Sequence, residues 1–284
     1  MKNEVLEKIR LFLIDIDGVI VKGDTPIEGV AEGIGILRRN GARTLFLTNN
    51  STRSRRTLIQ WFKDAGIDTA AEDMFPSSYL AAQYVFNSGL KTVYIIGEKG
   101  LLEEFTKAGL KIVTENVEDC DAVVVGLDRD FNYSKLTKGF SLIRNGARFI
   151  AANTDATLPL EKGEIPGAGA MVGSLKGCTG KRPILLGKPN TFLVKLALDM
   201  TGNKVSECAI VGDRPDTDMA MARKGGCVGI IVLTGVANKK YCKDYPADQR
   251  PDLIYPSLLE LTKDYENARK NNQNNIQTNV HPKN

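Results

Sequence analysis

The sequence predicts an α/β protein whose core is a Rossmann-like, doubly wound parallel sheet. Three observations carry this prediction. Short apolar runs bounded by polar turn formers recur along the 284 residues, as is typical of buried parallel strands. Segments with apolar residues at helical spacing separate these runs. Polar clusters directly follow several runs, at the strand ends where open α/β sheets bind their ligands.

The first run, residues 11–19 (LFLIDIDGV), ends in two carboxylates one residue apart. Asp15 is expected at a strand tip, and a turn eased by Gly18 brings Asp15 and Asp17 towards one small volume. Such a pair can bind a divalent cation, attack an electrophile or transfer a proton. Asp and Gly are also ordinary turn residues, so this motif alone is explained equally well by a turn that merely ends the strand.

A helix over residues 26–40 and a strand over 44–47 come next, and five small hydrogen-bonding residues follow the strand. They are Thr48, Asn49, Asn50, Ser51 and Thr52. Hydroxyl and main-chain N–H groups can hold phosphoryl oxygens without adding charge. Ser51 or Thr52 would equally well cap the next helix, and the two roles are compatible because a helix N-terminus is itself an anion site.

The character of the sequence changes near residues 72–76 and again near 180–182. Between them the pattern predicts alternating helices and strands, enough for a separate α/β unit. The last part of this insert, residues 153–170, is rich in turn formers. Asn153, Asp155 and the turn at residues 167–169 could face a ligand there, although a plain surface connection explains each of them slightly better.

Two further strands again consist of an apolar run followed closely by charged residues, like the strands before the insert. Residues 184–186 place Lys188 at a strand tip, where a lysine can neutralise a phosphoryl group, although a lone lysine is more often solvated surface. Residues 208–211 are followed by Asp213, Asp216 and Asp218, whose mutual repulsion costs stability unless a cation offsets it. Because parallel strands end on one edge, the four polar clusters are expected to converge on a phosphoryl-transfer site.

Composition excludes several other classes of function. A net charge of +4, with 38 basic and 34 acidic residues well mixed, predicts no nucleic acid polymer as partner, and no apolar run approaches membrane-spanning length. The only histidine, His281, lies in an Asn-rich tail (266–284) predicted to be disordered, which excludes histidine-dependent catalysis in the folded body. Five cysteines without C-x-x-C spacing predict reduced thiols and a cytoplasmic protein.

The segments DIDGV, LTNNS, GKP and GDRPDTD resemble, in order, the four motifs of the haloacid dehalogenase (HAD) superfamily. The position of the insert resembles the subfamily IIA phosphatases, which include NagD nucleotidases, p-nitrophenyl phosphatases and phosphoglycolate phosphatases. The resemblance implies a hydrolase core of residues 1–75 and 182–265 with an inserted α/β (C2-type) cap of residues 76–181. The cap is expected to close over the site by hinges near residues 72–76 and 180–182, and its loop around 153–169 to set substrate choice.

The resemblance also implies Mg²⁺-dependent hydrolysis of a small-molecule phosphate monoester. Asp15 would attack phosphorus and form an aspartyl-phosphate, while Asp17 would act as acid and then as base. The other implied contacts are Mg²⁺ binding by Asp15, the Asp17 main-chain carbonyl and Asp213, orientation of that site by Asp218, and phosphoryl binding by Thr48, Asn49, Asn50 and Lys188.

Two alternatives remain open at this stage. A mutase of the same fold would transfer the phosphoryl group to another acceptor, but such enzymes favour a helical cap after the first motif, where only a short helix near Val30 is expected here. A catalytically silent ligand-binding module is the other alternative, and the intact motif residues argue against it. Exposed strand edges in the cap suggest a homodimer.

Overall fold

The structure is a computed structural model and describes residues 2–23, 25–114, 116–159, 163–237, 242 and 244–280. The chain forms two compact units. Unit one comprises Met1–Phe46, Ala65–Ile67 and Val194–Asn284, and unit two comprises Leu47–Asp64 and Asp68–Leu193. The segment expected to form the cap, residues 76–181, falls within unit two, together with flanking residues that the sequence assigns to the core.

Unit one is built on a parallel sheet with the strand order β15-β14-β13-β1-β4. Leu11 pairs with Cys208, Ala209 with Val228, and Ile230 with Leu253. The bounds are β1 (Leu11–Asp15), β4 (Arg43–Thr48), β5 (Met74–Pro76), β13 (Cys208–Gly212), β14 (Val228–Val232) and β15 (Leu253–Tyr255). β1 and β13 are buried at every position, as expected for strands covered on both faces.

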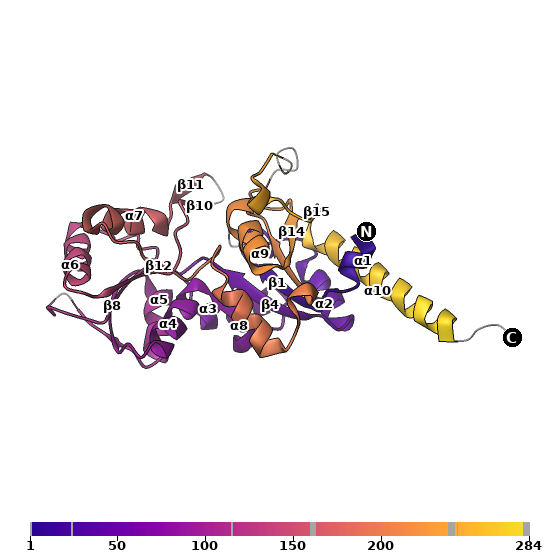
Figure 1. Ribbon diagram of the computed structural model, residues 1–284, viewed down its shortest axis with the longest axis horizontal. Coiled ribbons are helices and arrows are strands. Elements are labelled where there is room, and N and C mark those ends of the chain that lie inside the picture. Colours follow the sequence, from indigo (N-terminus) through magenta and orange to yellow (C-terminus); the bar gives the residue numbers. More distant parts are fainter. Residues whose placement is uncertain are drawn as a thin grey trace. The chain divides into compact units, whose positions relative to one another are not determined.

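The C-terminal helix α10 (Leu258–Val280) packs against α1 (Lys2–Leu6) and α2 (Val30–Arg39) in unit one (Figure 1). Tyr265 is fully buried, its ring meets Phe12 edge-to-face at 5.2 Å between centroids, and its hydroxyl donates to the Ile9 carbonyl at 3.0 Å. Ala268 is buried as well. The helix therefore continues past residue 266, where composition predicts a disordered tail; His281 lies outside the described residues.

Unit two contains a second parallel sheet, with the order β12-β9-β8-β6-β7. Its strands are β6 (Thr92–Ile96), β7 (Lys111–Ile112), β8 (Ala122–Val125), β9 (Arg148–Ala151) and β12 (Ile184–Leu185). The strand before Lys188 was expected in the first sheet, but β12 pairs with β9, with Ile184 opposite Ile150. A two-residue strand contains no local pattern that specifies which sheet it joins, so this assignment was wrong.

Helices cover both faces of the second sheet. Val85 of α4 and Phe105 of α5 pack with Val93, whereas Leu142 of α6 and Leu175 of α7 pack with its neighbours Tyr94 and Val123. This alternation is the signature of a strand buried on both sides. These four helices are α4 (Ser77–Asn87), α5 (Lys99–Lys107), α6 (Tyr133–Arg144) and α7 (Ala168–Thr179); unit two also contains α3 (Arg55–Asp64).

The remaining elements are short or lie between the larger ones. The hairpin β10 (Thr157–Pro159) and β11 (Glu164–Pro166) occupies the loop predicted near residues 153–170. The others are β2 (Val21–Lys22), β3 (Thr25–Pro26), α8 (Phe192–Thr201), α9 (Ala220–Gly225), the π-helical turn η3 (Pro215–Met219), and the 3₁₀ turns η1 (Ala71–Asp73), η2 (Val205–Glu207) and η5 (Ala247–Gln249). Parallel sheets with helices on their faces confirm the predicted fold class.

Replacing Tyr265 with alanine is expected to lower the free energy of unfolding by about 3–5 kcal/mol, because the change empties a fully buried ring site. Tyr265→Phe keeps the ring and loses only the bond to Ile9, at a cost of about 1 kcal/mol. Urea unfolding measures both. Tyr133→Ala, at a residue 81% exposed, is the matched control and should change stability by less than about 0.5 kcal/mol. Equal effects of the two alanine variants would contradict the packing of α10.

Candidate active site

Three carboxylates meet at the carboxyl edge of the unit-one sheet. Asp15 ends β1, Asp213 follows β13, and Asp218 lies in the π-helical turn η3. Each offers an oxygen that lies within 4.8 Å of the others, and all three residues are at most 3% exposed. The adjacent parallel strands β1 and β13 bring two of them together, as the strand-tip argument predicts.

Main-chain N–H groups orient all three carboxylates. Ile16 donates to Asp15 Oδ1 at 2.8 Å, Val236 to Asp213 Oδ2 at 2.7 Å, and Arg214 to Asp218 Oδ2 at 3.0 Å. Each carboxylate is therefore fixed in part by a main-chain N–H group.

Glycines allow the backbone to approach these carboxylates closely. A Cβ atom on Gly18, whose φ is +82°, or on Gly235 would overlap the Asp213 carboxylate, and one on Gly212 would overlap Asp218. Thr234 donates its hydroxyl to the Gly18 carbonyl at 2.6 Å. The segment after β14 is thus part of the site. Sequence reasoning predicted that strand but overlooked the residues at its tip, although the same strand-tip rule would have found them.

The donor set fits a divalent cation. Three ionised carboxylates buried this closely repel one another unless positive charge offsets them, and carboxylate oxygens are the ligands that Mg²⁺ and Ca²⁺ prefer. Asp17 lies two residues beyond β1 in the turn before β2, is partly exposed, and is not one of the three clustered carboxylates.

In unit two, the residues after β4 form a hydrogen-bonded loop. Thr48 Oγ1 accepts from the Asn50 N–H at 2.9 Å. Asn50 Oδ1 accepts from the Thr52 N–H at 3.0 Å and from the Thr52 hydroxyl at 2.7 Å. Thr48 and Asn49 are buried. The predicted polar cluster is therefore an ordered turn stabilised by its own side chains.

Asn49 connects this loop to Lys188. Its Oδ1 accepts from the Lys188 N–H at 2.8 Å, and its Nδ2 donates to the Lys188 carbonyl at 3.2 Å and to Asp155 Oδ1 at 2.8 Å. Its own carbonyl accepts from Asn153 Nδ2 at 2.6 Å and from Ser77 Oγ at 2.7 Å. Asn153 and Asp155, for which a ligand contact and a plain surface connection were both considered, thus contact the loop after β4.

The site residues are divided between the two units. Asp15, Asp17, Asp213 and Asp218 belong to unit one, whereas Thr48, Asn49, Asn50 and Lys188 belong to unit two. In unit one Asp15, Asp213 and Asp218 come together, and in unit two Asn49 contacts the backbone of Lys188. Their convergence across the units stays a prediction.

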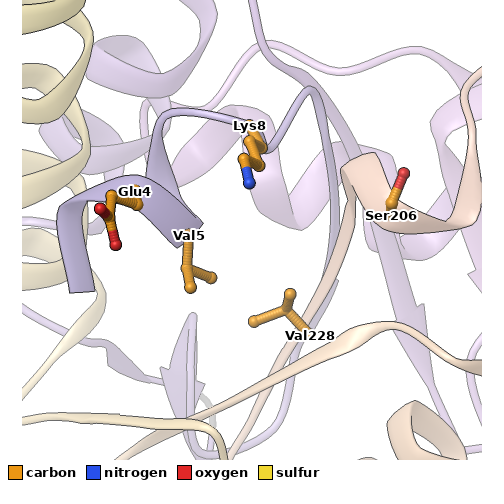
Figure 2. A pocket seen from close by; sticks show the side chains of 5 residues that line it. All are labelled: Glu4, Val5, Lys8, Ser206 and Val228. Carbon is orange, nitrogen blue, oxygen red and sulfur yellow. The ribbon is translucent and has the colours of Figure 1, made fainter. Parts of the chain in front are cut away.

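A pocket of about 340 Å³ in unit one lies elsewhere. Glu4, Val5, Lys8, Ser206 and Val228 surround it (Figure 2). Val228 begins β14 and Ser206 precedes β13, so this pocket borders the amino-terminal edge of the sheet, opposite the three carboxylates. Substrate chemistry is therefore not assigned to it.

The spacing Cys208-x5-Arg214 matches cysteine-dependent phosphatases, but the structure argues against that chemistry. Cys208 is fully buried at the start of β13. A side-chain hydrogen bond with Cys227, together with burial, raises the pKa of the Cys208 thiol. A thiol with a raised pKa supplies little of the thiolate that such a nucleophile needs.

Two family models match the chain. Residues 12–111 match the model described as haloacid dehalogenase-like hydrolase, and residues 185–261 match one described as HAD-hydrolase-like. The chain is 39% identical over 282 residues to phosphoglycolate phosphatase 1A, chloroplastic, of Arabidopsis thaliana; the match covers 91% of this chain and 78% of that protein.

Two solved structures extend the comparison. The p-nitrophenyl phosphatase from Archaeoglobus fulgidus has a TM-score of 0.84 at 34% identity, covering 90% of this chain and 98% of that one. The glycerol phosphate phosphatase Rv1692 from Mycobacterium tuberculosis, solved in complex with magnesium, has a TM-score of 0.82 at 33% identity, covering 92% of this chain and 79% of that one.

The fold and these matches define a hydrolase with an α/β fold that acts on phosphate monoesters. The chain belongs to the haloacid dehalogenase superfamily, in subfamily IIA with NagD and the p-nitrophenyl phosphatases, as its motifs indicated. Among the described residues, none of the helices combines the length and the apolar character needed to cross a bilayer.

Gly235→Ala is expected to weaken Mg²⁺ binding at least tenfold, because the added methyl group would displace Asp213. Isothermal titration with MgCl₂ measures the affinity directly. Gly177→Ala in α7 is the matched control, since nothing lies within 4 Å of its added Cβ and alanine favours a helix. Unchanged Mg²⁺ affinity in a folded Gly235→Ala protein would contradict a metal site at Asp213.

Proposed function

We propose that this protein is a Mg²⁺-dependent phosphatase that hydrolyses a small-molecule phosphate monoester through an aspartyl-phosphate. The observation that carries the proposal is the buried group of Asp15, Asp213 and Asp218 at the strand tips. Membership in a family of phosphatases supplies the reaction class.

The proposed reaction has two displacement steps. An Asp15 carboxylate oxygen forms a bond to phosphorus as the bond to the ester oxygen breaks, and Asp17 gives its proton to the leaving alkoxide. Asp17, now ionised, then takes a proton from water as that water attacks the phosphorus of the aspartyl-phosphate. The Asp15–phosphorus bond breaks, inorganic phosphate is released, and both carboxyl groups regain their starting state.

Asp15, Asp213 and the Asp17 main-chain carbonyl would hold Mg²⁺, with Asp218 beside them. Bound there, Mg²⁺ would neutralise charge on the phosphoryl group and on the carboxylates. The magnesium complex of the Rv1692 phosphatase supports this choice of metal. The position of Asp218 beside Asp15 and Asp213 supports a role in binding Mg²⁺ or in orienting the other metal ligands. Its Oδ2 is already fixed by the Arg214 N–H.

Thr48, the Asn49 main-chain N–H, Asn50 and Lys188 would bind the phosphoryl oxygens. Donors that are already oriented before the reaction stabilise developing charge at little cost in reorganisation. The hydrogen-bonded turn at Thr48 and the buried position of Lys188 support this assignment.

The substrate class is a small phosphate ester, because the relatives named above act on phosphoglycolate, p-nitrophenyl phosphate and glycerol phosphate. Residues 76–181 would serve as a cap that excludes water and contacts the leaving group, over a core of residues 1–75 and 182–265. Five free thiols support a reducing, cytoplasmic location. A homodimer through the cap is proposed from the edge strand β7.

Asp15→Asn is expected to lower the rate of p-nitrophenyl phosphate hydrolysis at least about 10³-fold, because the nucleophile is lost. Asp216→Asn is the matched control: this carboxylate lies in the GDRPDTD motif beside Asp213, is exposed, and pairs with Arg214. The control should retain activity within about twofold. Phosphate release by an Asp15→Asn protein at the wild-type rate would contradict the proposed nucleophile.

Removal of the metal should abolish turnover reversibly. Wild-type protein treated with a chelator and dialysed is expected to release no phosphate until Mg²⁺ is added, because three clustered carboxylates would repel the phosphate ester. Cys208→Ala is expected to behave like wild type in the same assay, since Cys208 lies buried at the far end of β13. Metal-independent activity that depends on Cys208 would favour the cysteine-based alternative.

A further inference from the structure

The side chain of Asn49 is committed to Lys188 and is not turned to solvent. Asn49 is 7% exposed, and its amide oxygen and nitrogen contact the main-chain N–H and carbonyl of the same lysine. A planar amide offers one acceptor and one donor side by side, which matches the two polar groups of one residue's backbone. An ionised aspartate has no donor for the carbonyl, and leucine has neither a donor nor an acceptor.

Two features hold this pairing in place. Asp155 Oδ1 accepts the second N–H of the Asn49 amide at 2.8 Å, and Asn153 and Ser77 both donate to the Asn49 carbonyl. Gly187 lets the strand end come close, because a Cβ there would lie 2.5 Å from both Asn49 Oδ1 and the Ala152 carbonyl oxygen. Five hydrogen bonds therefore fix Asn49 within unit two.

We propose that Asn49 is a positioning residue for Lys188 and that Asp155 is its support. Clamping the N–H and the carbonyl of Lys188 fixes the direction in which its side chain leaves the backbone. The phosphoryl-binding loop and the lysine then form one preorganised set of donors, which lowers the cost of orienting them during the reaction. This inference rests on the proposed function, in which Lys188 binds the phosphoryl group.

The inference differs from the expectation that Asp155 selects the substrate. A support for Asn49 affects every phosphate ester alike, because it acts on the phosphoryl contacts. A residue that touches the leaving group changes the relative rates of different esters. A panel of p-nitrophenyl phosphate, phosphoglycolate and glycerol phosphate separates the two roles.

The first test is an exchange of the hydrogen-bonding pair. Asn49→Asp places a carboxylate against Asp155 and against the Lys188 carbonyl, and kcat is expected to fall about 10²-fold for all three esters, with a smaller change in KM. Adding Asp155→Asn restores a donor to the new carboxylate and should recover at least tenfold of kcat. Asn145→Asp is the matched control, because this exposed asparagine bonds only to a backbone carbonyl.

The second test is a double-mutant cycle with Lys188→Ala, which keeps the lysine's backbone. If Asn49 acts through the lysine side chain, Asn49→Asp should lower kcat less than threefold further in the Lys188→Ala protein. A further 10²-fold loss of kcat when Asn49→Asp is added to Lys188→Ala would overturn the inference. So would a failure of Asp155→Asn to restore kcat to the Asn49→Asp protein, provided that both proteins unfold at the wild-type temperature. Ester-dependent effects of the Asp155 change would overturn its supporting role.

Two measurements keep this inference separate from the proposed function. Mg²⁺-dependent turnover by the wild-type protein, and its loss in Lys188→Ala, must hold for the proposed function to stand. If either fails, the proposed chemistry is wrong and the positioning role falls with it. If both hold and the exchange and cycle give the contrary results, only the role of Asn49 is wrong.

Discussion

Burying Asp15, Asp213 and Asp218 within 4.8 Å of one another costs free energy because the carboxylates repel one another. The backbone around them in unit one offsets part of this repulsion. Two unit charges about 4 Å apart repel by about 4 kcal/mol at an effective dielectric constant of about 20. Amide N–H groups from Ile16, Arg214 and Val236 offset part of the repulsion and fix the directions of the carboxylates. The site therefore favours a cation, and any substituent at the adjoining glycines would push the carboxylates apart.

The carboxyl edge of the sheet in unit two contacts another segment of the chain. In open α/β sheets this edge usually binds a ligand, but here it holds the chain's own loop after β4. Residues following four of its five strands contact that loop: Gly100 donates to the Thr52 carbonyl, Leu127 to Ser51 Oγ, Asn153 to the Asn49 carbonyl, and Lys188 to Asn49 Oδ1. These hydrogen bonds orient the loop, so substitutions at the strand ends are expected to act first on the phosphoryl contacts proposed for it.

The sequence predicted the position of a site residue correctly where that position depends on one strand alone. A buried run followed directly by a carboxylate places Asp15 and Asp213 at one edge, because neighbouring parallel strands end together. It did not predict contacts that depend on a residue or strand far away in the sequence. The two residues of β12 contain no signal for the sheet they join, and the side chain of Asn49 finds Asp155 more than a hundred residues away. After residue 266 the Asn-rich composition predicted disorder, whereas α10 extends to Val280 and buries Ala268.

The contacts of the loop after β9 constrain how substrate choice can be made. Asn153 and Asp155 are committed to Asn49, while Gly167 and Gly169 pack on the backbone of Asp155. A side chain cannot adapt to a new leaving group if the phosphoryl contacts depend on its present position. If Asn49 positions Lys188 as proposed, discrimination between esters within this loop falls to side chains outside this network. Substrate preference would then change while the proposed phosphoryl donors stay fixed.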